Sequence, residues 1–459
     1  MGQAPIPTGR PTPVFTDSDF ERLDAGLADT DRLLAKGYPG DSGTRQPVHT
    51  VYVPADRFAP SLPAEWGEAA LAAAEEAGGV RGLAELVGLP PELAAEVAPR
   101  VEDKLRTEPI EDLRIDFEDG YLAPAKAAAL HGGAGGDADA TEDAEALRAA
   151  DAVVRAASGS AGQPGGTTPF IGIRFKCFEE ATRRRGLRTL ELFVSRLVEA
   201  GGGPESLPDG LVLTLPKVTT VDQVRAMVYA VERLESALGL RPGRLGFEVQ
   251  VETPQLIIGP DGSHPVAQLP HRAVGRITAL HYGTYDYSAS LGIAAAYQSM
   301  EHPAADFAKE VMQLAVAGTG IRLSDGSTNV LPVGGPDQRA DAWRLHARLV
   351  RRSLERGYYQ GWDLHAHQLP TRYIATYAFY REGLAAATAR LRNYVDQTPG
   401  AVLDEPATAR ALAAFVLRGV QCGAVGGDEV LAAAGLAEPE LTALAHPRLA
   451  QQLPAPLSH

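Results

Sequence analysis

Eight short runs rich in β-branched and aromatic residues recur along the chain, separated by longer stretches with helical periodicity. The eight runs, predicted to be strands, span residues 49–55, 113–120, 170–175, 211–217, 247–254, 276–283, 320–324 and 357–364. Strands that alternate with helices favour a parallel α/β architecture. Eight such units suit a (β/α)8 barrel, which typically needs about 250 residues plus any insertions. A doubly wound open sheet is the alternative, but no glycine fingerprint follows the first strand.

The predicted barrel occupies residues 49–370 of the 459-residue chain. Residues 1–48 carry many Pro and Gly and are interpreted as an N-terminal arm or lid. Residues 63–104 are rich in Ala, Leu and Glu, and are predicted to be a helical insertion after the first strand. Residues 371–459 are predicted to form a C-terminal helical extension.

Composition excludes several classes of protein. The net charge of −15 argues against nucleic acid or an anionic membrane as the main partner. Only two cysteines are present, Cys177 and Cys422, which fits a reducing compartment and not a disulfide framework. We find neither an apolar run long enough to span a membrane nor a signal-peptide core at the N-terminus. The expected location is therefore the cytoplasm.

The run 247–254 alternates between an apolar and a polar face. Its polar members are Glu248, Gln250 and Glu252. Because Thr253-Pro254 cannot extend a central strand, Glu252 is expected at the carboxyl tip of this strand. Glu248 and Gln250 lie deeper and are interpreted as polar filling of the barrel.

Polar residues also follow the neighbouring strands, where barrel enzymes place their active sites. The candidates are Glu118, Asp119, Arg174, Lys217, Glu252 and Asp286. Glu252 and Asp286 end adjacent strands, and two carboxylates there would suit a hard divalent ion such as Mg²⁺. In the alternative interpretation, each carboxylate caps the following helix or pairs with Arg174 or Lys217.

The cationic candidates have alternatives of their own. An inward Arg174 would offer a planar fork to a substrate carboxylate, or would form a buried ion pair with Glu118. Lys217 would hold a charge, form a Schiff base, or be solvated in a loop. His365 and His367 invite a metal assignment, but no carboxylate at a fixed spacing supports one, so a structural role is favoured.

The order of these motifs resembles that of the HpcH/HpaI aldolase and citrate lyase β-subunit family, which includes malyl-CoA lyases. The resemblance covers about residues 49–370. Its segments are Val53-Pro54, Asp116-Phe117-Glu118-Asp119, Ile173-Arg174-Phe175-Lys176, Leu215-Pro216-Lys217-Val218, Val251-Glu252-Thr253-Pro254, Gly283-Thr284-Tyr285-Asp286-Tyr287, and Gly361 with His365-Ala366-His367-Gln368. The chain departs from the family pattern at Lys176, where asparagine is usual, and at Ala366, where proline is usual.

The resemblance implies that Glu252 and Asp286 bind Mg²⁺, with Mn²⁺ as the alternative metal. It implies a carbon–carbon lyase or aldolase that works through a metal-stabilised enolate of a small, pyruvate-like 2-oxo acid. Arg174 would neutralise enolate or carboxylate charge, and Lys217 would act electrostatically. Glu118 and Asp119 would hold metal-bound waters or relay a proton.

Three other functions stay open on the sequence. One is a CoA-thioester lyase of the malyl-CoA, citramalyl-CoA or citryl type, and another is a different reaction on a phosphoenolpyruvate-like ligand. The third is a non-catalytic barrel used for binding or assembly. The expected partner is a small oxo acid or an acyl-CoA. A homo-oligomer is also expected, because helical C-terminal extensions of such barrels often pack on a neighbouring subunit.

Overall fold

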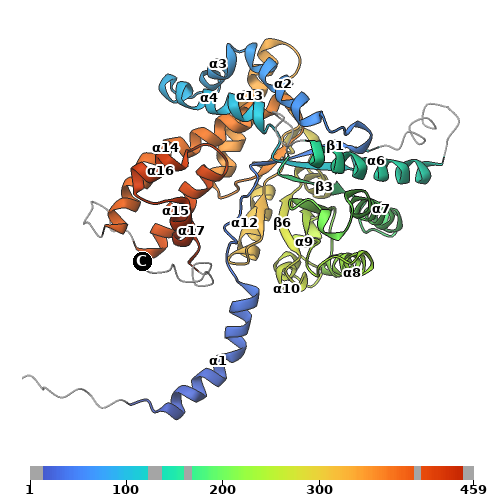
Figure 1. Ribbon diagram of the computed structural model, residues 1–459, viewed down its shortest axis with the longest axis vertical. Helices are drawn as coiled ribbons and strands as arrows, with labels where there is room; N and C mark the ends of the chain where they lie inside the picture. The colour runs from blue at the N-terminus through green and yellow to red at the C-terminus, as the bar shows by residue number, and fades with distance from the viewer. Residues whose placement is uncertain (1–13, 122–136, 160–167, 397–404, 448–459) are drawn as a thin grey trace, which may run out of the picture.

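The computed structural model describes residues 14–121, 137–159, 168–396 and 405–447. It contains eight parallel strands in the order β7-β6-β5-β4-β3-β2-β1-β8 (Figure 1). The strands are β1 (His49–Pro54), β2 (Asp112–Asp116), β3 (Phe170–Arg174), β4 (Leu211–Leu215), β5 (Phe247–Val251), β6 (Ile277–Tyr282), β7 (Arg322–Ser324) and β8 (Gly361–Asp363). A parallel bridge from Ser324 to Gln360 links the two outer strands of this order. The predicted (β/α)8 barrel is therefore confirmed.

Helices connect the strands and surround the barrel. Those between strands are α2 (Leu62–Glu75), α3 (Gly79–Leu86), α4 (Pro91–Thr107), α6 (Ala138–Gly159), α7 (Arg183–Gly201), α8 (Val221–Leu238), α9 (Pro254–Ile257), α10 (Leu269–Arg272), α11 (Thr284–Ser290), α12 (Pro303–Val316) and α13 (Pro336–Glu355). The helical stretch predicted over 63–104 is three helices. Besides the expected break at Pro90-Pro91, the chain turns at Gly78 and Gly79, which both have positive φ. None of the described helices combines the length and the apolar character needed to cross a membrane.

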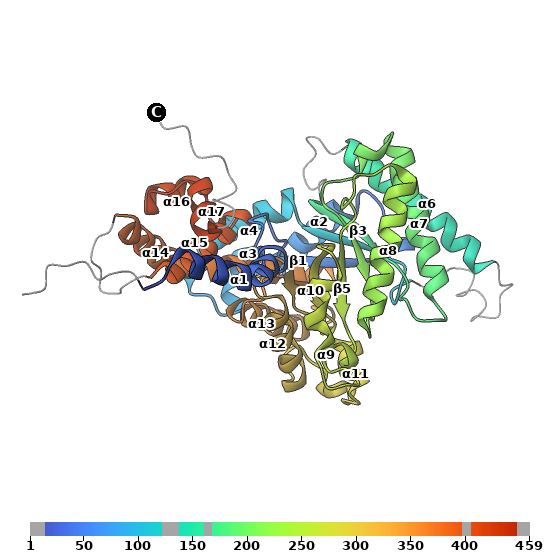
Figure 2. The ribbon, with the colours of Figure 1, turned by 90° about the horizontal axis from the view of Figure 1, so that it is seen from below.

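The ends of the chain add further helices. Helix α1 (Asp17–Gly37) precedes the barrel, and α14 (Leu369–Val395), α15 (Pro406–Gln421), α16 (Gly427–Ala434) and α17 (Glu438–Ala445) follow it. The C-terminal helices lie on the side of the barrel opposite α7 and α8 (Figures 1 and 2), and α14 packs against α4 and α13. The division into arm, barrel and extension stays a prediction, and parts of the arm and of the extension lie outside the described residues.

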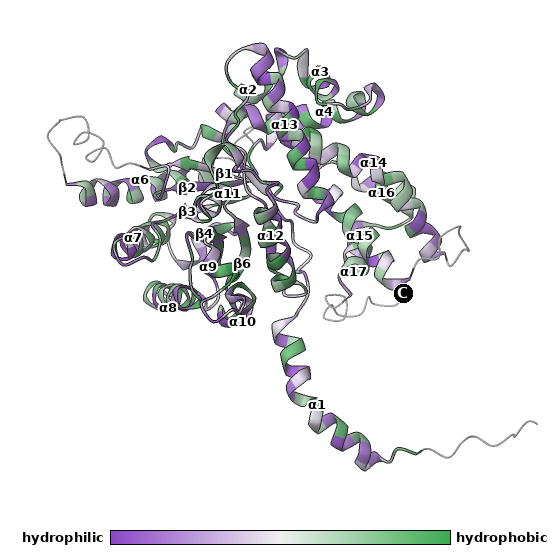
Figure 3. Cartoon of the chain, turned by 180° about the vertical axis from the view of Figure 1, so that it is seen from behind, coloured by the Kyte–Doolittle hydropathy of each residue, from purple (hydrophilic) through white to green (hydrophobic). Residues whose placement is uncertain are grey.

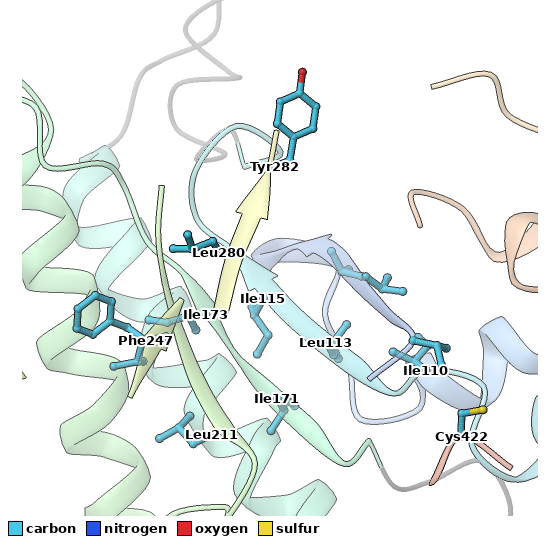
Figure 4. Packing of buried hydrophobic residues seen from close by; sticks show 14 of the residues in the cluster. Ile110, Leu113, Ile115, Ile171, Ile173, Leu211, Phe247, Leu280, Tyr282 and Cys422 are labelled. Atoms are coloured by element: carbon cyan, nitrogen blue, oxygen red, sulfur yellow. The ribbon is translucent and has the colours of Figure 1, made fainter. Parts of the chain in front are cut away.

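Aliphatic side chains of the strands form the main hydrophobic core. On β2, Leu113 and Ile115 are fully buried and alternate with polar residues. They lie close to Ile171 and Ile173 of the adjacent β3 (Figure 4). The cluster continues into the surrounding helices, so the barrel wall and the helical layer share one core.

A network of charged and polar side chains fills the barrel interior. Arg114 of β2 donates to Glu248 of β5 at 2.8 Å and to Thr214 of β4 at 3.0 Å. His281 of β6 lies 3.0 Å from the same Glu248 carboxylate. Because β2 borders neither β4 nor β5, these contacts must cross the interior. Glu248 thus pairs inside the barrel, as its place in the sequence suggested.

A second buried ion cluster ties the N-terminal arm to the barrel. The carboxylate of Glu111, which is fully buried, lies 2.7 Å from Arg45 of the arm and 2.6 Å from Lys104 of α4. It also accepts the backbone N–H of Val48 at 2.8 Å. Burial opposes ionisation, but Lys104 and Arg45 lower the pKa of Glu111 to about 2.

This cluster predicts a loss of stability in acid. The folded-state pKa of Glu111 lies below its unfolded value of 4.5, so its contribution is complete above pH 4.5 and falls as the pH drops towards 2. The shift corresponds to about 3 kcal/mol of unfolding free energy. Urea denaturation between pH 2 and pH 7 should show this slope in the wild type and lose it in Glu111→Gln. The exposed Glu205→Gln serves as the control, and an unchanged slope in Glu111→Gln would contradict the assignment.

Candidate active site at the carboxyl end of the barrel

The six candidate residues lie at the carboxyl ends of five consecutive strands. Their positions are Glu118 and Asp119 just after β2, Arg174 at the end of β3, Lys217 just after β4, Glu252 just after β5, and Asp286 in the first turn of α11 after β6. Direct contacts or electrostatic interactions connect all six. The structure therefore brings together the whole predicted set, while the role of each member stays a prediction.

Arg174 is held by a carboxylate that the sequence analysis did not single out. Its Nε and Nη2 donate to the two oxygens of Asp116 at 2.7 and 2.6 Å. The expected alternative, an ion pair with Glu118, is a longer contact of 4.0 Å through Nη1. The guanidinium also lies 4.8 Å from the centre of the Tyr52 ring, so it is fixed on several sides.

Strand register explains why Asp116 is the partner. Asp116 and Arg174 are directly paired neighbours on β2 and β3, whereas Glu118 lies two residues beyond the pair. Asp116 also accepts the backbone N–H groups of Glu118 at 3.0 Å and Gly120 at 2.9 Å. It therefore shapes the loop that carries Glu118 and Asp119. Two sequence signals pointed to it: its position on the polar face of the predicted strand, and its place at the start of the acidic segment Asp116-Phe117-Glu118-Asp119.

Lys217 joins the acidic loop to Glu252. Its ammonium donates to Glu118 at 3.0 Å and to Asp119, and its backbone N–H donates to Glu252 at 3.0 Å. The residue has a φ of 50°, a left-handed conformation that costs a non-glycine residue roughly 1–2 kcal/mol. Although burial opposes it, Asp119 and Glu118 raise the pKa of Lys217 above its usual value. Lys217 is thus a cation at neutral pH, which argues against the Schiff-base alternative.

The two predicted metal ligands are carboxylates that make no ion pair within the described residues; Glu252 is buried and Asp286 is half-buried. Glu252 is 2% exposed, and burial together with the charge of Asp286 raises its pKa to about 8, with Arg174 opposing the shift. Burial also raises the pKa of Asp286, and within the described chain its carboxylate makes no hydrogen bond or ion pair. The backbone makes room for Glu252 at Gly283, where a Cβ would lie 2.6 Å from Glu252 Oε1.

These features fit a hard divalent cation. Neither carboxylate forms an ion pair within the described chain, although Arg174 is near enough to act on both. Mg²⁺ usually takes one or two carboxylates from a protein and leaves its other positions to water and substrate. Among the described residues no group of three or more His, Cys, Asp or Glu side chains could hold a metal ion. The protein's share of such a site would therefore be Glu252 and Asp286.

The pKa of Glu118 lies close to neutral pH. Burial, and the hydrogen bond that its carboxyl group shares with Asp119, raise the pKa of Glu118 to about 7, while Arg174 and Lys217 oppose the shift. A carboxyl group with such a pKa can accept and release a proton at neutral pH. The adjacent Asp119 has its pKa lowered by Glu118, Arg174 and Lys217 in spite of burial. The environment thus gives the two neighbouring acids different protonation states.

Several other sequence features have structural roles. Lys176, which stands where the resembled family has asparagine, donates to Glu142 and to the Phe117 carbonyl, both at 2.7 Å. His365 accepts the backbone N–H of His367 at 3.1 Å, and the His367 ring lies 3.1 Å from the Pro332 carbonyl. These contacts agree with the hydrogen-bonding interpretation of the two histidines.

Comparison with known proteins gives one family and a set of similar folds. The family model described as Domain of unknown function (DUF6986) matches residues 27–449. No curated protein matches the sequence. A citrate lyase from Burkholderia xenovorans LB400 is 18% identical, with a TM-score of 0.50, and the match covers 89% of this chain and 98% of that one. The similarity to this structure is one of fold.

Two other solved structures show weaker similarity. A malate synthase from Haloferax volcanii with glyoxylate is 15% identical over 72% of this chain and 74% of that one, with a TM-score of 0.42. CitE from Mycobacterium tuberculosis, in complex with magnesium, acetoacetate and coenzyme A, is 16% identical over 83% of this chain and 99% of that one, with a TM-score of 0.42. Membership of the HpcH/HpaI and citrate lyase β-subunit family stays a prediction.

Proposed function

The chain belongs to the family described as Domain of unknown function (DUF6986), and we propose that it is a Mg²⁺-dependent carbon–carbon lyase acting on a small 2-oxo acid. The observation that carries this proposal is the pair formed by the buried Glu252 and the half-buried Asp286 beside a fixed Arg174, at the end of the barrel where such folds place their chemistry. Mn²⁺ is the alternative metal.

In this proposal, the metal ligands and Arg174 have different roles. Glu252 and Asp286 would hold the cation, which would supply a Lewis acid for the negative charge that develops on the substrate oxygens. Arg174 has two of its N–H groups committed to Asp116, and its Nη1, which also donates to Gln250 at 3.4 Å, would bind a substrate carboxylate or the oxygen of the enolate. Because Arg174 cannot reorient without breaking its contacts with Asp116, this charge is in place before the substrate arrives.

The acidic loop after β2 would carry out the proton transfer. Glu118, with a pKa of about 7, would take a proton from the substrate carbon or hydroxyl group, or return it. The Lys217 ammonium, 3.0 Å from Glu118, would keep the carboxylate oriented and stabilise its charged form. The enolate would serve both directions of the reaction, because a carbon–carbon bond forms or breaks at the same carbon.

Enolisation can be tested without knowing the second substrate. We expect the methyl protons of pyruvate to exchange with deuterated water in the presence of the protein and Mg²⁺, followed by proton NMR, and the exchange to stop when the metal is chelated. A parallel sample with acetyl-CoA distinguishes a thioester lyase, since only its acetyl methyl group would then exchange. Exchange in neither sample, with Mg²⁺ binding intact, would favour the non-catalytic barrel over both enzymes.

A further inference from the structure

Helix α1 presents an apolar stripe that no other part of the described chain covers. It spans 21 residues, begins with a capping box between Thr16 and Asp19, and buries none of its side chains. The stripe, which repeats with the spacing of a heptad, consists of Phe20, Leu23, Leu27 and Leu34, between 45% and 53% exposed. The helix projects clear of the barrel in Figure 1, and Figure 3 shows hydrophobic segments along it.

The base of α1 is fixed while the rest extends away. Tyr38, just after the helix, packs edge-on against His271 of α10 with ring centres 5.3 Å apart. Gly40 donates its backbone N–H to Gly318 at 2.8 Å. These contacts fix the C-terminal end of α1 against the barrel, and the rest of the helix projects away from it. An amphipathic helix gains most of its stability from packing its apolar face, and this face stays exposed among the described residues.

The charges beside the stripe argue against pairing of two α1 helices. Asp24 and Asp31 flank one side of the stripe and Asp19 the other. In an antiparallel pair the positions held by Asp24 and Asp31 would face each other across the interface, and like charges there are destabilising. The surface that best complements the stripe is therefore apolar and flanked by positively charged side chains.

The chain carries such a surface between α7 and α8. A cavity of about 370 Å³ lies in the groove between these helices, and its lining includes Leu187, Leu190, Leu234 and Tyr229. Tyr229 is 67% exposed, so the groove offers apolar surface to solvent. Two exposed arginines, Arg183 and Arg233, line it, and within the described chain neither has an ion-pair partner.

We propose that α1 of one copy of this chain docks into the α7–α8 groove of a second copy. The apolar stripe would cover Leu187, Leu234 and Tyr229, and the acidic flanks of α1 would meet Arg183 and Arg233. The lengths agree, since α1 has 21 residues, α7 has 19 and α8 has 18. A reciprocal exchange of the two arms closes as a twofold dimer, the commonest symmetry of homo-oligomers. This interface differs from the C-terminal one that the sequence suggested.

A disulfide trap tests the contact in the full-length chain. Cys177 and Cys422 are buried, so cysteines introduced by Leu27→Cys and Tyr229→Cys would be the reactive ones. Mild oxidation of this double variant is expected to give a covalent dimer. The matched control pairs Leu27→Cys with Leu314→Cys on α12, where the side chain is 80% exposed, and it should stay monomeric on a denaturing gel. A dimer from Leu27→Cys alone, or a disulfide within one chain, would overturn the proposal.

Charge reversal gives a second, independent measurement. Light scattering at micromolar concentration is expected to give twice the chain mass for the wild type. Arg183→Glu combined with Arg233→Glu should weaken the dimer at least tenfold, and adding Asp24→Arg with Asp31→Arg should restore it. All four positions are exposed, so the barrel should fold in each variant. A monomeric wild type, or a dimer indifferent to the reversal, would contradict the docking of α1 in this groove.

Discussion

Replacing Glu252 by Gln is expected to abolish Mg²⁺ binding and to slow metal-dependent exchange of pyruvate by about 10³-fold or more. The side chain keeps its size and its position after β5, but the site loses one of its two anionic oxygen ligands. A Lewis acid at a developing negative charge supplies several kcal/mol of transition-state stabilisation, and each 1.4 kcal/mol is a factor of ten in rate. Isothermal titration with Mg²⁺ and oxalate, together with the NMR exchange rate, measures both effects.

The same substitution at an exposed carboxylate is the control. Glu205→Gln removes a carboxylate from a short 3-10 helix (Pro204–Ser206) that precedes β4, at the end of the barrel opposite the candidate residues, and should leave both measurements unchanged. Thermal denaturation of Glu252→Gln should show a fold at least as stable as the wild type, because a carboxyl group whose pKa is raised by burial is relieved when it becomes neutral. If Glu252→Gln bound Mg²⁺ as tightly as the wild type, this result would contradict the proposed metal site.

The barrel could be predicted from sequence because its signals are local. Short runs of β-branched and aromatic residues marked all eight strands, and a strand such as β5, which also alternates with period two, needs no knowledge of its neighbours to be recognised. The candidate site followed from the same reasoning, since residues just after parallel strands must gather at one end of a barrel. Glu252, Asp286 and Lys217 were found in this way.

The contacts between side chains on different strands could not be predicted from the sequence. Whether Arg174 contacts Asp116 or Glu118 depends on the register of β2 against β3, and a shift of two residues would exchange the partners while leaving each strand's own pattern intact. The contact of Arg114 with Glu248 depends on which strands face each other across the interior. The sequence also could not predict that α1 projects away from the barrel, because a helix packed on its own barrel would carry the same apolar stripe.

The partnership of Arg174 with Asp116 leads to the second large effect. Arg174→Lys is expected to reduce the rate of pyruvate exchange by about 10²-fold. Lysine keeps the positive charge, but a single ammonium cannot hold both oxygens of Asp116 and also reach a substrate with a third N–H. Losing one preorganised donor to a developing oxyanion typically costs about 10²–10³ in kcat. NMR exchange rates, normalised to the folded fraction, measure the change.

Arg276→Lys separates this positioning from plain stability. Arg276 is also buried and also pairs with both oxygens of one carboxylate, Glu235, but it precedes β6 at the opposite end of the barrel. Both variants should lose about 1–3 kcal/mol of unfolding free energy, because each disrupts a buried bidentate ion pair between an arginine and a carboxylate. Only Arg174→Lys should slow the exchange per folded molecule. Equal loss of activity in the two variants would mean that Arg174 stabilises the fold and that other groups bind the substrate.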